Sequence, residues 1–285
     1  MTEGELWTQE VLAELRASGF RPQAWVRFIA QSLSFARERR RDRPLEHRAT
    51  VVLGGLGLAA WVAVAATGRP LLAAAGALWW VLATLMLDWH LGMLETQDGR
   101  RVDGLGPANM LTFLRAGTPP AVFALFATSA GIGLLAAAGL SDVLDGWLAR
   151  RRGETTRLGR WLDGSVDGLV IGAAALGSLQ TGRAPAWLIA LILVRYAAPW
   201  ILVATMTFAH AKTPDPARLV SGRLPGLVLF VGLLLLSLDV GAGITVSALG
   251  AVGGLATLAA TLVFSFRPAV AARARFHGRS KRYSA

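Results

Sequence analysis

The chain contains no cysteine, few histidines and few charged residues. Of its 285 residues, none is Cys, four are His and 16% are Asp, Glu, Lys or Arg, whereas 54% are hydrophobic. The absence of cysteine excludes disulfides, thiol nucleophiles and cysteine metal sites, and it leaves no redox signal for the compartment. The histidines lack ligand spacing, and no P-loop or Rossmann glycine pattern precedes a predicted helix. This composition is typical of a polytopic helical membrane protein and not of a soluble domain.

Arginine-rich runs lie next to the hydrophobic segments. The formal net charge is +11, and because the basic residues gather beside apolar stretches, we expect membrane lipids and not nucleic acid as the partner. Residues 37–43 precede the first apolar run and, by the positive-inside rule, hold the amino terminus in the cytoplasm. Since that run starts only near Thr50 and follows a polar sequence, no cleavable secretory signal is expected.

Eight apolar segments predict an all-α fold, a polytopic membrane helical bundle. Residues 1–47 are expected to form amphipathic surface helices, which lie on a membrane, pack on the body of the protein or bind a partner. Residues 48–105 predict a transmembrane hairpin and a cytoplasmic linker, because a Gly-Arg-Pro turn divides two apolar runs. Residues 106–267 predict a six-helix core, and residues 268–285 predict a basic cytoplasmic tail. The tryptophans, Trp80 among them, are expected to be interface anchors or lipid-facing side chains.

The topology follows from the number of spans. A cytoplasmic start and eight spans return the carboxyl terminus to the cytoplasm. The basic runs then lie on the cytoplasmic side, while the outer turns carry mainly Arg69 and Arg183. We therefore expect an integral protein of the cell (inner) membrane with both termini in the cytoplasm.

Four aspartates lie where two predicted spans meet the cytoplasm. Asp142 and Asp145 are three residues apart, and Asp163 and Asp167 are four apart, so each pair shares one face of its helix. An antiparallel helix pair would bring the four carboxylates together, and they would repel strongly unless hard divalent cations lay between them. The alternative is a solvated cytoplasmic loop with ordinary surface acids, although these acids fall at helical spacing within apolar segments.

The acidic stretch resembles the signature of the CDP-alcohol phosphotransferase family. The spacing Asp-x2-Asp-Gly-x2-Ala-Arg-x8-Gly-x3-Asp-x3-Asp is matched without departure by Asp142, Asp145, Gly146, Ala149, Arg150, Gly159, Asp163 and Asp167. The resemblance covers about residues 106–267 and implies a catalytic core that works in phospholipid biosynthesis. Such an enzyme moves a phosphatidyl, or other substituted phosphoryl, group from CDP-diacylglycerol or another CDP-alcohol to the hydroxyl of a second alcohol, and releases CMP. A homodimer is also implied.

The resemblance implies metal ligands and a base on the cytoplasmic side. Two divalent ions, Mg²⁺ or Mn²⁺, would be held by Asp142, Asp145, Asp163 and Asp167. Asp167 would also be the catalytic base that takes the proton of the acceptor hydroxyl.

The resemblance also implies a set of nucleotide-binding residues. Residues 107–115 are similar to the family's Pro-Asn-x-Leu-Thr-x-x-Arg stretch, displaced by one inserted alanine, and Asn109, Thr112 and Arg115 share a helical face. The expected nucleotide contacts are Pro107, Ala108, Asn109, Thr112, Gly146, Arg150 and Thr156. For Asn109 and Thr156, capping of a helix is an equally good interpretation.

A buried arginine points to the acceptor site. Arg195 lies near the middle of an apolar run, where a charge is costly unless it faces a polar cavity inside the bundle. With Lys212, Arg218 and Arg223 it would form a positive pocket for a phosphate-bearing or otherwise anionic alcohol, although pairing of Arg195 with an internal acid is an alternative. The family's Ser-Gly-Lys-x-x-Thr stretch departs here, because residues 221–226 carry Arg for Lys and lack the Thr. The identity of the acceptor therefore stays open.

Two other classes of function use the same features. A divalent-cation channel or carrier would need acids along a path across the bilayer, whereas the four predicted ligands lie toward one face. A non-catalytic paralogue that binds lipid or nucleotide would be expected to have lost one of the acids, and all four are present. The role of residues 1–105 lies outside the resemblance; covering a lateral lipid entrance and forming dimer contacts are two hypotheses.

Overall fold

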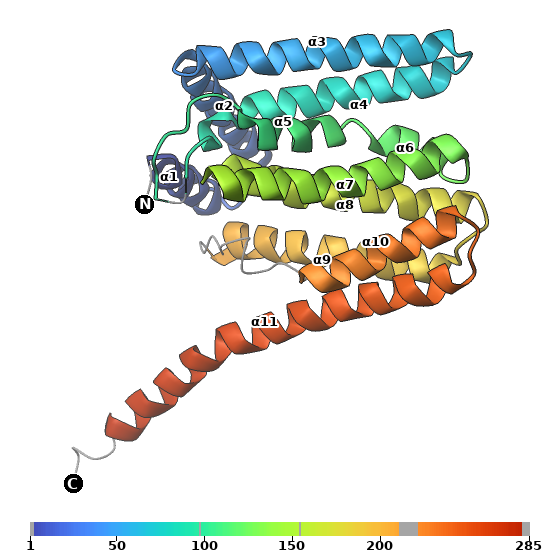
Figure 1. Ribbon diagram of the computed structural model, residues 1–285. Coiled ribbons are helices and arrows are strands. Elements are labelled where there is room, and N and C mark those ends of the chain that lie inside the picture. The colour runs from blue at the N-terminus through green and yellow to red at the C-terminus, as the bar shows by residue number, and fades with distance from the viewer. Residues whose placement is uncertain (1–2, 97, 154, 211–221, 281–285) are drawn as a thin grey trace.

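The computed structural model describes residues 3–96, 98–153, 155–210 and 222–280 as a helical bundle (Figure 1). In chain order its helices are α1 (Glu3–Ala17), α2 (Pro22–Arg41), α3 (Pro44–Ala66), α4 (Pro70–Trp89), the short 3-10 helix η1 (Leu91–Met93), α5 (Gly106–Arg115), α6 (Pro119–Leu125), α7 (Ser129–Arg152), α8 (Arg157–Gln180), α9 (Ala186–His210), α10 (Arg223–Ser237) and α11 (Ala242–Ser280). The predicted all-α fold class is confirmed.

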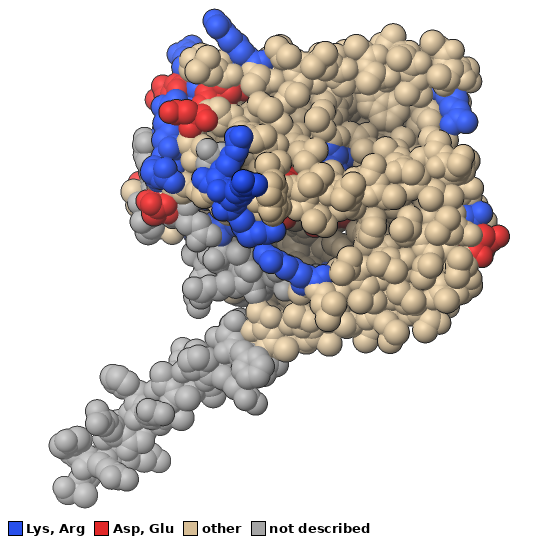
Figure 2. All heavy atoms as spheres, viewed as in Figure 1, with Lys and Arg blue, Asp and Glu red and all other residues tan. Residues whose placement is uncertain are grey.

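Six of the described helices are long and apolar enough to cross a membrane, namely α3, α4, α7, α8, α9 and α11. The two remaining predicted spans correspond to α10, a shorter apolar helix of 15 residues, and to the pair α5 and α6. Charged residues gather at the two ends of the visible face of the bundle, and the surface between them is largely uncharged (Figure 2). The protein is therefore an integral membrane protein.

The first core segment is two short helices rather than one continuous span. Helix α5 ends at Arg115, and α6 begins at Pro119, which lies in its first turn and is followed by Pro120. Two successive prolines lack amide donors and cannot continue the preceding helix, so the chain restarts there. The break leaves Arg115 at the end of α5, inside the bundle.

Helices α3 and α4 are held together by tryptophans that pack on glycines. A Cβ added to Gly57 would lie 2.1 Å from the Trp80 ring, and one added to Gly76 would lie 2.3 Å from the Trp61 ring. The Trp80 indole also donates a hydrogen bond of 2.8 Å to the carbonyl of Gly54. Trp80 is only 2% exposed, so its expected role as an interface anchor is wrong. It fills the space that the glycines leave between two helices.

Helices α1 and α2 lie at one end of the bundle (Figure 1). The rings of Trp7 and Phe35 stack 4.3 Å apart and join the two helices. The Arg16 guanidinium donates to the carbonyl of Thr207 on α9 at 3.0 Å, and Leu15 is buried. Helix α1 therefore packs on the body of the protein. The turns from α3 to α4, α8 to α9 and α10 to α11 lie at the opposite end.

Candidate active site

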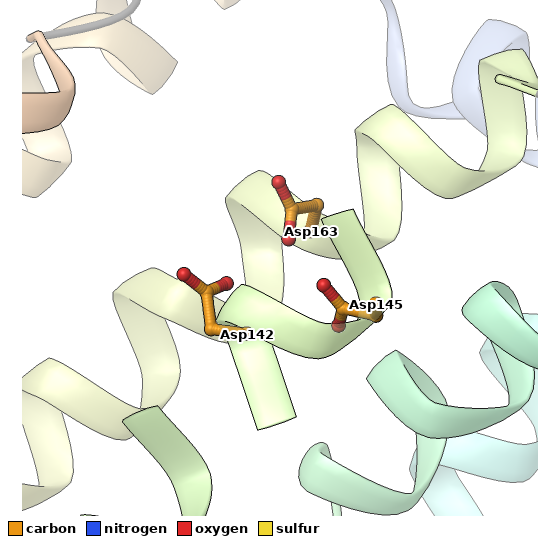
Figure 3. A group of neighbouring side chains, drawn as sticks. All are labelled: Asp142, Asp145 and Asp163. Carbon is orange, nitrogen blue, oxygen red and sulfur yellow. The ribbon is translucent and has the colours of Figure 1, made fainter. Parts of the chain in front are cut away.

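Two helices that run in opposite directions bring the predicted aspartates to one place. Asp142 and Asp145 lie on α7, and Asp163 and Asp167 lie on α8. One carboxylate oxygen from each of Asp142, Asp145 and Asp163 lies within 4.8 Å of the others. Figure 3 shows these three side chains gathered together. Asp145 is buried, but the side chain of Asp163 is 51% exposed, so the cluster is open on one side.

The turn between α7 and α8 fixes where the second helix starts. Helix α7 ends at Gly153, whose φ of 64° lies in the left-handed region that glycine adopts without strain. The hydroxyl of Thr156 accepts a hydrogen bond of 2.9 Å from the amide of Gly159 and so caps α8. Thr156 is buried, and this geometry supports the capping interpretation. A contact of Thr156 with nucleotide stays a prediction.

An arginine from α5 lies among the four acids. The Arg115 guanidinium is 3.1 Å from carboxylate oxygens of both Asp163 and Asp167 and 3.4 Å from Asp145. It also pairs with Asp142. Its side chain is 4% exposed, so these charges interact in a medium that screens them weakly. Arg115 was predicted to share a face with Asn109 and Thr112 but was not assigned to the site, although a basic residue at that spacing in an apolar stretch was the available signal.

The donor set fits a divalent cation. Four carboxylates and one guanidinium leave a formal charge of about −3 if all are ionised, and this excess of negative charge favours binding of additional cations. Carboxylate oxygens are the ligands that Mg²⁺ and Mn²⁺ prefer. The hydroxyl of Thr112 donates to Asp145 Oδ2 at 2.7 Å, which orients one of these carboxylates. The geometry and the chemistry of the cluster therefore fit a metal centre.

Helix α5 is tied to α8 through Asn109. Its side-chain amide donates to the carbonyl of Leu105 at 2.7 Å and to the Thr156 hydroxyl at 3.3 Å. A Cβ added to Gly159 would lie 2.5 Å from the Asn109 side-chain oxygen, so the signature glycine lets the two helices approach. Asn109 is 8% exposed. It therefore joins the two helices, and it lies four residues inside the start of α5 rather than at its cap.

The other predicted nucleotide residues lie in the first turn of α5 and near the end of α7. Pro107 and Ala108 are half-buried in the first turn of α5. Arg150 is exposed, and a Cβ added to Gly146 would lie 3.2 Å from its guanidinium nitrogen. The glycine therefore allows the arginine side chain to lie back along α7 toward the acids. This position is compatible with a contact between Arg150 and a phosphate.

Arg195 lies inside the bundle, as predicted. It is 2% exposed, and a Cβ added to Gly254 on α11 would lie 2.0 Å from its Nε, so only glycine leaves room for the guanidinium. The guanidinium carbon is 4.9 Å from the centre of the Tyr196 ring. Gly226 on α10 is also near, because its added Cβ would lie 3.6 Å from Arg195 Nη2. Three helices therefore enclose this cation.

The rest of the predicted acceptor pocket is only partly described. Arg223 is the first residue of α10 and is exposed. Lys212 and Arg218 lie outside the described residues. Tyr196 was not among the predicted site residues. Its ring lies 3.3 Å from the position that a Cβ on Gly168 of α8 would take, and the Arg195 guanidinium carbon lies 4.9 Å from its centre, so the tyrosine packs against both α8 and Arg195. Its position next to that arginine in an apolar run was the only signal.

Parts of the chain are similar in sequence to known proteins. A probable cardiolipin synthase (CMP-forming) of Drosophila melanogaster is 31% identical over 112 residues, which cover 38% of this chain and 34% of the relative. A cardiolipin synthase (CMP-forming) of Streptomyces coelicolor is 34% identical over 123 residues, 43% of this chain and 56% of the relative. A probable phosphatidylglycerophosphate synthase of Mycobacterium tuberculosis is 36% identical over 97 residues, 31% of this chain and 46% of the relative.

The similarity to these relatives is partial. The matched regions span from about a third to just over half of the relatives' own lengths. No solved structure matches the chain. The family described as CDP-alcohol phosphatidyltransferase, in contrast, matches residues 106–267, which run from the start of α5 into α11 and hold every residue of the acid cluster. The chain belongs to the CDP-alcohol phosphatidyltransferase family.

Proposed function

We propose that the protein transfers a phosphatidyl group from a CDP-alcohol, with CDP-diacylglycerol as the expected donor, to the hydroxyl of a second alcohol. CMP is the second product, and the reaction serves phospholipid biosynthesis. The observation that carries the proposal is the convergence of the four signature acids of α7 and α8 on one site that is open on one side. The family match and the relatives named as CMP-forming synthases support it.

The proposed reaction is one displacement at phosphorus. The acceptor hydroxyl oxygen forms a bond to the phosphorus that carries the lipid alcohol, and the bond from that phosphorus to the oxygen of CMP breaks. The hydroxyl proton passes to the Asp167 carboxylate. The Asp167 side chain is 38% exposed, so an acceptor can reach it from the open side of the cluster.

The charge of the diphosphate must be offset before the acceptor can approach. Asp142, Asp145, Asp163 and Asp167 would hold Mg²⁺ or Mn²⁺, which would supply positive charge to the diphosphate and to departing CMP. Thr112 fixes the orientation of Asp145 by its hydrogen bond. Arg115 supplies one permanent positive charge within the same group of acids.

The nucleotide is proposed to lie between α5 and the end of α7. Arg150, which extends over Gly146, would contact a phosphate, and the first turn of α5 at Pro107 and Ala108 would border the nucleoside. Asn109, Thr112 and Thr156 are buried and already hydrogen-bonded to one another or to Asp145. We infer that these three act mainly by holding the helix ends in register.

The acceptor is proposed to be an anionic alcohol. The buried Arg195 and the exposed Arg223 give the α9–α10 side of the bundle positive charge, to which Lys212 and Arg218 would add. A phosphate-bearing alcohol or a phospholipid would satisfy this charge. The matched relatives carry two different printed activities, so the class and not the compound is proposed.

The orientation and assembly are also proposals. The basic ends of α2 and α7 lie at the end of the bundle that holds the acids, and the positive-inside rule assigns that end to the cytoplasm of an inner membrane. A homodimer is expected by analogy with the family. A cation channel fits less well, because the acids gather at one point and do not follow a path through the described bundle.

The direct experiment is an assay of CMP release. The purified protein is supplied with CDP-diacylglycerol, Mg²⁺ or Mn²⁺, and a panel of acceptors that includes glycerol 3-phosphate, phosphatidylglycerol, inositol and serine. CMP should appear with at least one acceptor and should require the divalent ion, and Asp142→Asn should abolish it. An absence of CMP with CDP-diacylglycerol and every acceptor of the panel would contradict the proposed function.

A further inference from the structure

The linker before α5 is held by the amino-terminal hairpin. This linker segment, residues 94–96 and 98–105, lies outside the family match and connects α4 to α5. The carboxylate of Glu46 on α3 accepts a hydrogen bond of 3.0 Å from the amide of Gly104. Arg43, which precedes α3, donates to the carbonyl of Val102 at 3.3 Å. Glu46 is 3% and Arg43 is 6% exposed, so both contacts are shielded from water.

The same linker segment pairs with the turn between α7 and α8. Thr96 and Thr156 form an antiparallel bridge, and the amide of Arg157 donates to the carbonyl of Glu95 at 2.8 Å. The side chains of Arg157 and Glu95 are 3.6 Å apart. Thr156 caps α8 and contacts Asn109, so the linker segment meets the site where α5 and α8 come together.

These contacts link α3, through the linker segment, to the starts of α5 and α8. Glu46 fixes Gly104, two residues before α5 begins at Gly106, and the amide of Val102 donates to the carbonyl of Leu94 at 3.2 Å beside the Thr96 bridge. A charged acceptor on a backbone amide is a strong hydrogen bond, and in a buried position its loss leaves the amide unsatisfied. The hairpin itself is rigid, because tryptophans of each helix pack on glycines of the other.

We propose that Glu46 is a positioning residue for the nucleotide side of the active site. Through Gly104 and the linker segment it holds the starts of α5 and α8 in register, and with them Asn109, Thr156 and the acids on α8. The hairpin thereby acts as an anchor for the catalytic core, whatever it contributes to lipid access or to assembly. This inference rests on the proposed function, because it names the cytidine nucleotide as the ligand affected.

The test compares three variants with the wild-type protein. Glu46→Ala removes the acceptor, Glu46→Gln keeps an oxygen at that position, and Thr50→Val is the matched control. Thr50 lies one turn along α3 and is fully buried, and its hydroxyl donates to the carbonyl of Glu46 at 2.9 Å. Affinity for CMP is measured by calorimetry, and KM for CDP-diacylglycerol, KM for the acceptor and kcat are measured by CMP release.

Glu46→Ala should weaken CMP binding and raise KM for the CDP-alcohol by about fivefold to tenfold, while KM for the acceptor stays within about twofold. The kcat should fall as well, because the acids of α8 shift with the start of that helix. Glu46→Gln should restore CMP affinity, and Thr50→Val should leave it unchanged. Amide hydrogen exchange at residues 157–160 should accelerate in Glu46→Ala only. If Glu46→Ala does not fold, Glu46→Asp, which withdraws the carboxylate by one methylene, should give the same KM effect.

Two outcomes separate failure of this inference from failure of the proposed function. If Glu46→Ala, or Glu46→Asp in its place, binds CMP as tightly as Thr50→Val, Glu46 has no positioning role. If the wild-type protein neither binds CMP nor releases it from a CDP-alcohol, the proposed function itself is wrong.

Discussion

At the scale of single residues, Arg115 sets the charge balance of the acid cluster. It is the cation that all four aspartates share in the structure, with two of its carboxylate distances at 3.1 Å. A buried guanidinium among partly exposed carboxylates lowers their mutual repulsion without removing it. We therefore expect the same residue to stabilise the fold when divalent ions are scarce and to compete with them for the carboxylates when they are abundant.

Arg115→Met should consequently destabilise the protein most in the absence of metal. Removal of the cation leaves four acids facing one another, and we expect a loss of about 3 kcal/mol in the presence of EDTA. Saturating Mn²⁺ should recover most of this loss, because the ion replaces the missing charge. The thermal unfolding midpoint in detergent, with and without Mn²⁺, measures both effects. An equal decrease under both conditions would show that Arg115 acts by packing alone.

Asp167→Asn tests the base. The variant keeps the size of the side chain but cannot accept the hydroxyl proton, so CMP release should fall by about 100-fold or more. Saturation with Mg²⁺ or Mn²⁺ should not restore the rate. Near-normal turnover with metal present would remove Asp167 as the base and leave it only as a possible ligand.

At the scale of elements, the contact between α5 and α8 determines whether the site forms. Position 159 on α8 has room for glycine alone, because a Cβ there would lie 2.5 Å from the side-chain oxygen of Asn109. The cap at Thr156 and the hydrogen bond from Asn109 then fix the start of α8 relative to α5. Because Asp163 and Asp167 lie on successive turns of α8, a displacement at its start moves both acids together.

Gly159→Ala should therefore destabilise the protein, whereas the same change at Gly164 should not. The new methyl at position 159 would lie 2.5 Å from Asn109 Oδ1, whereas at position 164, within the described part of the chain, it would meet open space beyond the backbone of its own helix. We expect Gly159→Ala to destabilise the protein by about 1–3 kcal/mol and to weaken CMP binding. Gly164→Ala should be neutral or stabilise it by up to about 1 kcal/mol through helix propensity.

Thermal unfolding and CMP calorimetry on both variants make the comparison. Two alanines on the same helix share every effect of propensity, so a difference between them reports the α5–α8 contact. Equal unfolding midpoints and equal CMP affinities would show that α5 can move aside without consequence for the site.

At the scale of the whole molecule, the distribution of basic residues between the two ends of the bundle is the basis of the proposed orientation. The end of the bundle with α1, α2 and the acid cluster carries the basic ends of α2 and α7. The opposite end carries Arg69 and Arg183, and the latter donates to the carbonyl of Leu236 at 3.2 Å. Because this hydrogen bond holds Arg183 at a turn, its charge stays at that end of the bundle.

The cysteine-free chain allows a direct measurement of this orientation. A single cysteine at Arg69 should react with a membrane-impermeant maleimide in intact cells. One at Arg151, an exposed residue at the end of α7, should react only after the membrane is permeabilised. The reverse pattern would place the acid cluster on the outer side and contradict the proposed orientation.

The sequence by itself determined the helices, the membrane and the grouping of the acids. Hydrophobic runs and residues spaced three or four apart are local properties of a helix, so the shared faces of Asp142 with Asp145 and of Asp163 with Asp167 could be predicted. The prolines at 119 and 120 are a local signal of the same kind, because they interrupt a helix. The first core segment was nevertheless predicted as one span.

Only the tertiary structure decided which distant groups meet. The position of Arg115 among the acids, the burial of Trp80 against Gly57, and the bond from Gly104 to Glu46 join residues far apart along the chain. Periodicity says which face a side chain occupies, but the packing of helices decides what lies opposite that face. The acids therefore followed from local spacing, whereas their counter-charge and the support of the site depended on how the helices pack.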